Sequence, residues 1–252
     1  MMPVTGNNTS LAISTKSVSI RLWPGGLSFF YMDGERPIEG TQFFQTDNFT
    51  ARSVTAALKN LPPHTTERVA VYVDTSEVLF VPEEVLADGL HAELLRQAGI
   101  NIPVHHNIIT TEAIDGICGL FTLPAEIQHG LEANWQGVPV RWYSPLHELL
   151  SAGHQAAIIT GTVSDDTPET ANTTIYLLYA TLENMYVIGC DERGRTVLCE
   201  SYPCRSEAEA VYLLSCLTGP ANRRKIRLYI YGDRPVRYTK VLKRYYPHTK
   251  SI

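Results

Sequence analysis

One succession of predicted elements occurs twice in this chain of 252 residues. The first copy starts with two apolar strands, Val18–Leu22 and Leu27–Tyr31, on either side of a Pro24-Gly25-Gly26 turn. A third strand is expected at Thr41–Gln45, followed by a helix with apolar residues at i, i+3, i+4 and i+7. The β-branched run Val69–Val73 then predicts a buried strand, which completes a β-β-β-α-β unit. The apolar helix residues are Val54, Ala57, Leu58 and Leu61.

The second copy lies near the C-terminus. Its helix is expected to begin at a capping box formed by Ser206 and Glu209 and to stop at Gly219-Pro220. An offset of 158 residues, which pairs Asp33 with Asp191, keeps the elements of both copies in phase. Two such units predict an α/β chain in which each lobe has a mixed sheet with flanking helices. The expected strands are Thr174–Ala180, Met185–Cys190, Thr196–Tyr202 and Ile226–Tyr231.

The region between the copies predicts a small α/β subdomain followed by a linker. Two strands, a helix opened by Pro124, a third strand and a helix opened by Pro145 fill residues 106–159. Ser144 is expected to cap the last helix, with His147 on its surface. The predicted domains are therefore a first lobe at 1–160, with the inserted subdomain at about 104–160, a linker or exposed loop at 161–173, and a second lobe at 174–252.

Composition excludes several classes of protein. Hydrophobic residues make up 44% and charged residues 19%, the balance of a packed globular protein. The five cysteines are odd in number and contain no CxxC pair, which argues against a disulfide framework or a structural zinc site. The first twenty residues lack a leader pattern and no apolar stretch reaches membrane length, so we expect a cytoplasmic protein without a membrane span.

Two β-β-β-α-β units joined through a subdomain are similar to the actin and sugar kinase superfamily, whose lobes are duplicated and ribonuclease-H-like. More closely, the chain resembles an uncharacterised bacterial family with a degenerate actin-like ATPase fold. The matching segments are VSIRLWPGGLSFFYMD, LFVPEEVL, VRWYSPLHELL, TIYLLYATLENMYVIGCDERG and KIRLYIYGD. The resemblance implies internal duplication and a nucleotide cleft between the lobes, with two hairpin turns that carry an acid, a glycine and a small hydroxyl residue.

The first hairpin turn departs from that pattern. Gly25 and Gly26 would let a phosphate approach the backbone, and Ser28 follows them. Trp23, however, stands about where the acid belongs, and its bulk would displace a metal ion and its water. We therefore expect this turn to be a vestige of a phosphate site.

The second hairpin turn, residues 179–184, lacks glycine and carries Glu183 at its tip, where a carboxylate would repel phosphate. Asp74, after the strand Val69–Val73, is either a surviving site carboxylate or a turn former. Gly232 and Asp233 resemble the turn that seats adenine, or else Asp233 caps a helix that starts at Pro235. The candidate residues of a vestigial nucleotide cleft are Trp23, Gly25, Gly26, Ser28, Asp74, Gly232 and Asp233.

These departures predict a pseudoenzyme, a non-catalytic actin-like scaffold that binds another protein and holds no cofactor or metal. The alternative is an ATP-dependent kinase or ATPase that uses Asp74 and Asp33 with ATP and Mg²⁺. A second alternative is a nucleic-acid-associated protein, because from Arg223 onward there are ten Lys or Arg and the single acid Asp233. The net charge of −5 makes nucleic acid the less favoured partner.

Overall fold

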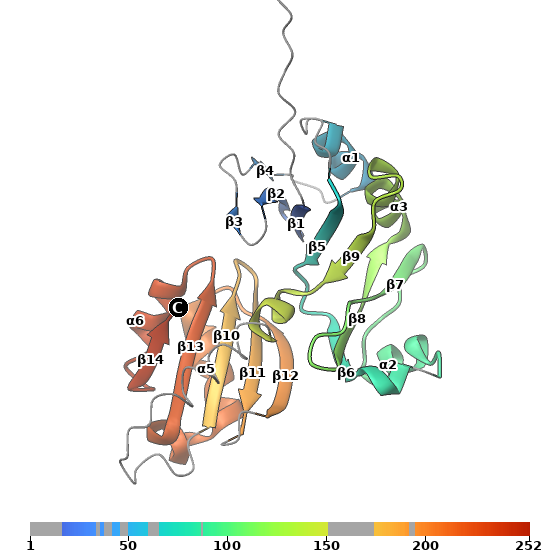
Figure 1. The fold of residues 1–252 in the computed structure, drawn as a ribbon. Helices are drawn as coiled ribbons and strands as arrows, with labels where there is room; N and C mark the ends of the chain where they lie inside the picture. Colours follow the sequence, from blue (N-terminus) through green and yellow to red (C-terminus); the bar gives the residue numbers. More distant parts are fainter. Residues whose placement is uncertain are drawn as a thin grey trace, which may run out of the picture. The chain divides into compact units, whose positions relative to one another are not determined.

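The computed structural model describes residues 17–33, 36–37, 42–45, 50–59, 66–86, 88–150, 174–191 and 195–252. The chain forms two compact units (Figure 1). The first consists of residues 1–71 and 126–141, and the second of residues 72–125 and 142–252. The predicted linker, residues 161–173, lies outside the described residues, and the division into lobes there stays a prediction.

The first sheet has the strand order β3-β2-β1-β5-β9, and β4 also pairs with β2. The predicted hairpin is confirmed: β1 and β2 are antiparallel, Ile20 lies opposite Phe29, and both side chains are fully buried. Helix α1 begins after Thr50, whose Oγ1 accepts a hydrogen bond from the Ser53 N–H at 3.2 Å. The elements are β1 (Ser17–Trp23), β2 (Gly26–Asp33), β3 (Arg36–Pro37), β4 (Gln42–Gln45), α1 (Ala51–Lys59), β5 (Arg68–Val73), α3 (Ala125–Asn134) and β9 (Val140–Tyr143).

A three-stranded antiparallel sheet, with the order β6-β8-β7, belongs to the second unit. Its strands are β6 (Val78–Pro82), β7 (His106–Thr110) and β8 (Ile117–Pro124). It differs from the predicted subdomain because β6 precedes residue 104 and β9 lies beside β5 in the first sheet. The leucines at positions 86, 90, 94 and 95 predict one helix from Pro82 that ends at Gly99, and this prediction is wrong. The short helix η1 (Glu83–Leu86) and α2 (His91–Gln97) are separate elements, and Gly89 between them has a φ of +70°.

The second sheet has the order β12-β11-β10-β13-β14. Strands β10 and β13 are parallel, and the predicted meander β10-β11-β12 is antiparallel. Helices α5 and α6 cover one face, where Leu214 and Tyr238 pack against strand residues such as Val187. The elements are β10 (Thr174–Ala180), β11 (Asn184–Cys190), β12 (Thr196–Pro203), α5 (Glu207–Thr218), η3 (Pro220–Lys225), β13 (Ile226–Gly232), α6 (Pro235–Leu242) and β14 (His248–Ser251).

The last helix is shorter than the sequence predicts. The spacing of Tyr238, Val241, Leu242 and Tyr245 predicts a helix over residues 235–246 with Tyr245 on the buried face, but α6 ends at Leu242. Tyr246 is fully buried instead, with its hydroxyl 3.0 Å from Thr218 Oγ1, while Tyr245 is 44% exposed. The chain then forms β14, which sequence analysis missed.

The two sheets share a strand order and a register. In the first, β2, β1 and β5 are neighbours in that order, and in the second β11, β10 and β13 are neighbours in the same way. Ile20 lies opposite Phe29 in the first hairpin, and Leu178 lies opposite Val187 in the second. The 158-residue offset relates the first pair to the second. The registers of the two hairpins therefore follow the predicted offset, and the duplication itself stays a prediction.

Within the described ranges, no helix is both long and apolar enough to cross a membrane.

Candidate functional site

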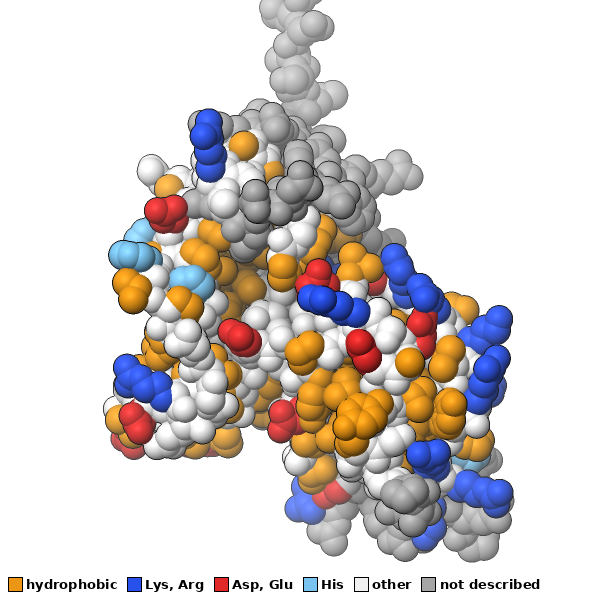
Figure 2. Space-filling view, turned by 180° about the vertical axis from the view of Figure 1, so that it is seen from behind, with side chains coloured by type: hydrophobic (Ala, Val, Ile, Leu, Met, Phe, Trp, Pro, Cys, Tyr) orange, Lys and Arg blue, Asp and Glu red, His pale blue; other side chains and the backbone are white. Residues whose placement is uncertain are grey.

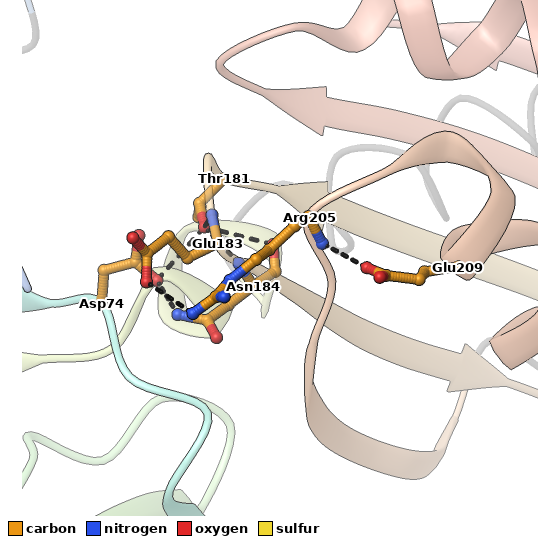
Figure 3. Close-up of polar contacts among 6 residues, drawn as sticks. All are labelled: Asp74, Thr181, Glu183, Asn184, Arg205 and Glu209. Atoms are coloured by element: carbon orange, nitrogen blue, oxygen red, sulfur yellow. Dashed lines mark hydrogen bonds and ion pairs between the residues drawn. The ribbon is translucent and has the colours of Figure 1, made fainter.

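Asp74 is held at the hairpin turn between β10 and β11 (Figure 3). The residue is only 4% exposed. The Oδ1 atom accepts hydrogen bonds from Asn184 Nδ2 at 2.8 Å, from the Tyr186 hydroxyl at 2.9 Å and from Thr181 Oγ1 at 3.3 Å. The Tyr186 hydroxyl also lies 2.9 Å from the Thr75 carbonyl oxygen. The carboxylate is thus part of a buried network that connects the end of β5 to the turn.

The turn itself is closed by its own hydrogen bonds. The Thr181 N–H donates to the Asn184 carbonyl at 2.9 Å. Thr181 Oγ1 accepts from the N–H of Asn184 at 2.9 Å and from the N–H of Glu183 at 3.3 Å. The Glu183 carbonyl accepts from the Cys204 N–H at 2.7 Å. Two amides that could face a phosphate are therefore already bonded to a side chain of the turn.

Glu183 is paired with an arginine beyond the turn. Arg205 Nη2 lies 3.7 Å from its carboxylate; the Arg205 side chain is 75% exposed and that of Glu183 is 37% exposed. The N–H of Arg205 donates to Glu209 Oε2 at 2.6 Å, and Ser206 Oγ accepts from the Glu209 N–H at 3.3 Å. The predicted capping box is confirmed for Ser206, but the Glu209 carboxylate reaches the N–H of Arg205 and not that of Ser206.

Gly232 and Asp233 lie beside this turn because β13 runs parallel to β10 with Gly232 opposite Ala180. A Cβ on Gly232 would lie 2.1 Å from the Ala180 carbonyl oxygen, and its φ is +110°. The Asp233 N–H donates to the same oxygen at 3.0 Å. The interpretation of Asp233 as the cap of α6 is wrong, because Arg234 occupies the N-cap position and makes no side-chain cap hydrogen bond.

The residues of the first turn belong to the first unit. Pro24 and Gly25 make the two-residue connection, and Trp23 lies opposite Gly26. The Trp23 indole covers the turn: its Nε1 is 3.1 Å from where a Cβ of Gly25 would stand. Ser28 is 1% exposed in β2. The structure thus brings Asp74, Gly232 and Asp233 to one turn and Trp23, Gly25, Gly26 and Ser28 to the other.

His147 is buried, which corrects the expectation that it lies on a helix surface. It is 1% exposed, its Nδ1 accepts from the Ser144 N–H at 3.0 Å, and its Nε2 lies 2.9 Å from Thr111 Oγ1. Burial lowers the pKa of His147 from 6.5 to about 4, so the ring is neutral. Ser144 does act as a cap, since its Oγ accepts from the Leu146 N–H at 3.1 Å. The sequence around His147 could have indicated its burial, because the neighbouring helical residues Leu146, Leu149 and Leu150 are apolar, and all three are buried.

Metal or thiol chemistry finds no support in the described part of the chain. No group of three or more His, Cys, Asp or Glu side chains is placed there to hold a metal ion. The cysteines are free thiols, and burial raises the pKa of Cys199 to about 12 and that of Cys204 to about 11. The raised pKa values favour the protonated form of the Cys199 and Cys204 thiols near neutral pH, which is the less nucleophilic form.

Comparison with known proteins identifies the fold. No protein-family model matches the sequence, and no curated protein matches it. A protein from Bacteroides thetaiotaomicron VPI-5482 with an actin-like ATPase fold and unknown function is similar in structure, with a TM-score of 0.72 and 13% identity over 95% of this chain and 91% of that one. A chain of a PilM–PilN type IV pilus biogenesis complex has a TM-score of 0.56 and 10% identity over 94% of this chain and 88% of that one. Identities this low establish the fold alone, and the conclusion is that this chain has an actin-like ATPase fold.

Proposed function

We propose that this protein is a non-catalytic, actin-like binding protein that recruits another protein and does not hydrolyse ATP. The observation that carries the proposal is the closed turn between β10 and β11. Phosphoryl-transfer sites need backbone amides that point at phosphate and a carboxylate that holds Mg²⁺ or orients a nucleophile. In this turn the amides of Glu183 and Asn184 bond to Thr181, and Asp74 Oδ1 bonds to three donors of the same unit.

The charge at the tip of the turn supports the same proposal. Glu183 places a carboxylate at the tip of the turn, where it would repel the negative charges of a triphosphate. The nearby cation, Arg205, is already paired with Glu183. In the first turn, the Trp23 indole stands over Gly25, at the place where a phosphate would approach the backbone. Both turns thus keep hairpin geometry while their polar groups serve the fold.

A protein partner is the favoured ligand class. One of the structurally similar chains comes from a complex of PilM with PilN, so that protein is found in an assembly with another protein. A scaffold of this fold needs no nucleotide chemistry to present a binding surface. We infer that this chain also acts by binding another protein, and that its partner is a different one.

The test is titration calorimetry with Mg²⁺·ATP, together with a phosphate-release assay on the wild-type protein. We expect neither a binding isotherm nor turnover, and an ATPase of known activity serves as the assay control. Saturable binding with turnover would overturn the proposal. In that case Asp74→Asn separates the remaining explanations, because a kinase or ATPase that uses this carboxylate loses its rate whereas one that does not keeps it.

A further inference from the structure

Helix α5 is apolar on the side that faces solvent as well as on the side that faces the sheet. Ala210, Leu214 and Thr218 are buried against the sheet. On the opposite side Ala208, Tyr212 and Cys216 are exposed, and their spacing of four residues places them in one stripe. A helix that covers a sheet in a single layer ordinarily has a polar outer face. The outer stripe of α5 is therefore more apolar than the fold requires.

Tyr212 is the most prominent member of this stripe, with 69% of its surface exposed. Tyrosine is enriched among the residues that dominate binding energy, because its ring offers a large rigid area and its hydroxyl a hydrogen bond. In the view of Figure 2, hydrophobic side chains gather in one area, with Lys and Arg on its outer side and some acidic side chains next to it. Such a combination on an exposed face is typical of a protein-binding site.

The positive border is connected to the stripe through Arg223. Its Nη2 donates to Ser215 Oγ of α5 at 3.1 Å, and its guanidinium lies 5.9 Å from the ring centroid of Tyr245. Arg224 and Lys225 follow it in η3, and Lys243 and Arg244 precede Tyr245; all four are exposed. None of these four has an ion pair among the described residues. We call the stripe and this border together the α5–α6 surface.

The acids near the start of α5 do not neutralise this border. Glu207 is paired with the Arg237 guanidinium. Glu209 keeps its charge but lies in the first turn of α5, whereas Arg223 bonds to Ser215 in the last turn. The border around Arg223 therefore presents positive charge next to apolar area. This charge selects the partner, because complementary charge favours association and like charge opposes it.

We propose that the α5–α6 surface binds an acidic, amphipathic segment of a partner protein. Apolar side chains of that segment pack on Tyr212 and Cys216, and its carboxylates pair with the basic side chains of the border. A second copy of this chain fits less well, since a two-fold contact would bring the same positive side chains face to face. Nucleic acid fits less well because its phosphates leave the apolar stripe uncovered. The inference rests on the proposed binding function and names the class of partner.

The test is selection of a random-peptide phage library on the wild-type protein, with counter-selection on a Tyr212→Asp variant. We expect enriched peptides to combine Asp or Glu with aromatic or aliphatic residues at helical spacing. Synthetic versions should bind the wild type, and Tyr212→Ala and the double variant Lys243→Glu/Arg244→Glu should each weaken binding about tenfold or more. Binding should also weaken as salt is raised.

Matched control variants lie on another part of the same unit. Arg96 of α2 and Val104 are exposed, so Arg96→Glu and Val104→Ser change charge and apolar area away from the α5–α6 surface. Both should bind the peptides as the wild type does. Circular dichroism of each variant establishes that a loss of binding is not a loss of fold.

Several results would overturn the inference. They are enriched peptides without acids, peptides that bind the surface variants unchanged, and a wild-type dimer that Tyr212→Asp dissociates. Binding of phosphatidylserine vesicles or single-stranded RNA that the surface variants abolish would also assign the surface to another ligand. Peptides that bind at another place would contradict the role of this surface but would still agree with a binding protein. ATP turnover would contradict the proposed function, whatever the result with the peptides.

Discussion

Asp74 is a buried carboxylate that is hydrogen-bonded to the hairpin turn between β10 and β11. The sequence left two interpretations open, a site carboxylate or a turn former. The structure places its Oδ1 among three donors from residues more than a hundred positions away in the chain. No local pattern around Asp74 indicates those partners, because they come from β11 and its turn. The sequence therefore identified Asp74 as a candidate but did not predict its hydrogen-bond partners.

Replacing Asp74 should destabilise the protein. Asp74→Ala removes the buried acceptor of the Asn184 amide and leaves the Tyr186 hydroxyl with the Thr75 carbonyl, which costs roughly 1–3 kcal/mol of unfolding free energy. Urea denaturation measures the change. Asp88→Ala, at an exposed position, is the control and should alter stability by less than about 0.5 kcal/mol. An Asp74→Ala variant as stable as the wild type would contradict this structural role.

His147 should make stability depend on pH. The folded pKa of about 4 lies below the unfolded value of 6.5, so the unfolded chain binds a proton that the folded chain does not. The full stability is present above about pH 6.5 and falls as the pH is lowered towards 4, by about 3 kcal/mol in all. Urea denaturation across that range should show a shallower dependence for His147→Gln. The exposed His129→Gln variant should keep the wild-type slope.

At the scale of elements, hairpins and helix starts were the most predictable features. Alternating apolar residues around short turns placed β1–β2 and β10–β11 correctly, and Ser206 marked the start of α5. Strand β14 was missed because His248–Ser251 is a polar segment without strand periodicity. It forms because the backbone of β13 offers hydrogen bonds along its free side, which is a tertiary cause. The break at Gly89 was missed because leucines continued the helical spacing across it.

The close approach of β10 and β13 predicts a severe effect of Gly232→Ala. The new Cβ would meet the Ala180 carbonyl oxygen at 2.1 Å, in a backbone conformation that side chains rarely adopt. We expect a loss of more than about 3 kcal/mol or a failure to fold. Gly116→Ala is the matched control, since its φ is +70° but nothing lies within 4 Å of the added atom. That variant should lose only about 1 kcal/mol in thermal denaturation. Equal losses in the two variants would show that backbone strain, and not the contact, decides the outcome.

For the whole molecule, the repeated pattern was sufficient to predict the fold class. A common offset carried through two turns and a helix is a stronger signal than any one motif, and the two sheets have the matching strand order that it implies. The grouping of elements between the copies was less predictable. Strand β9 joins the first sheet and β6 joins β8, although each lies nearer in sequence to other elements. Such pairings depend on long-range packing that a sequence window does not contain.

The proposed lack of nucleotide binding can be checked by thermal denaturation of the whole protein. A ligand that binds only the folded state raises apparent stability by mass action. Millimolar Mg²⁺·ATP should therefore leave the Tm unchanged within about 1 °C. A rise that grows with nucleotide concentration and is absent in Asp74→Asn would contradict the proposed function.

Strand β14 has a practical consequence for handling this protein. Its four residues pair with β13, and the Ile252 N–H also donates to the Ile230 carbonyl at 3.0 Å. A truncation before His248 would make the apolar strand β13 the edge of the sheet. Its unpaired N–H and C=O groups could then bond to neighbouring molecules. Shortened versions should therefore precipitate or associate edge to edge, and affinity tags are better separated from Ile252 by a flexible spacer.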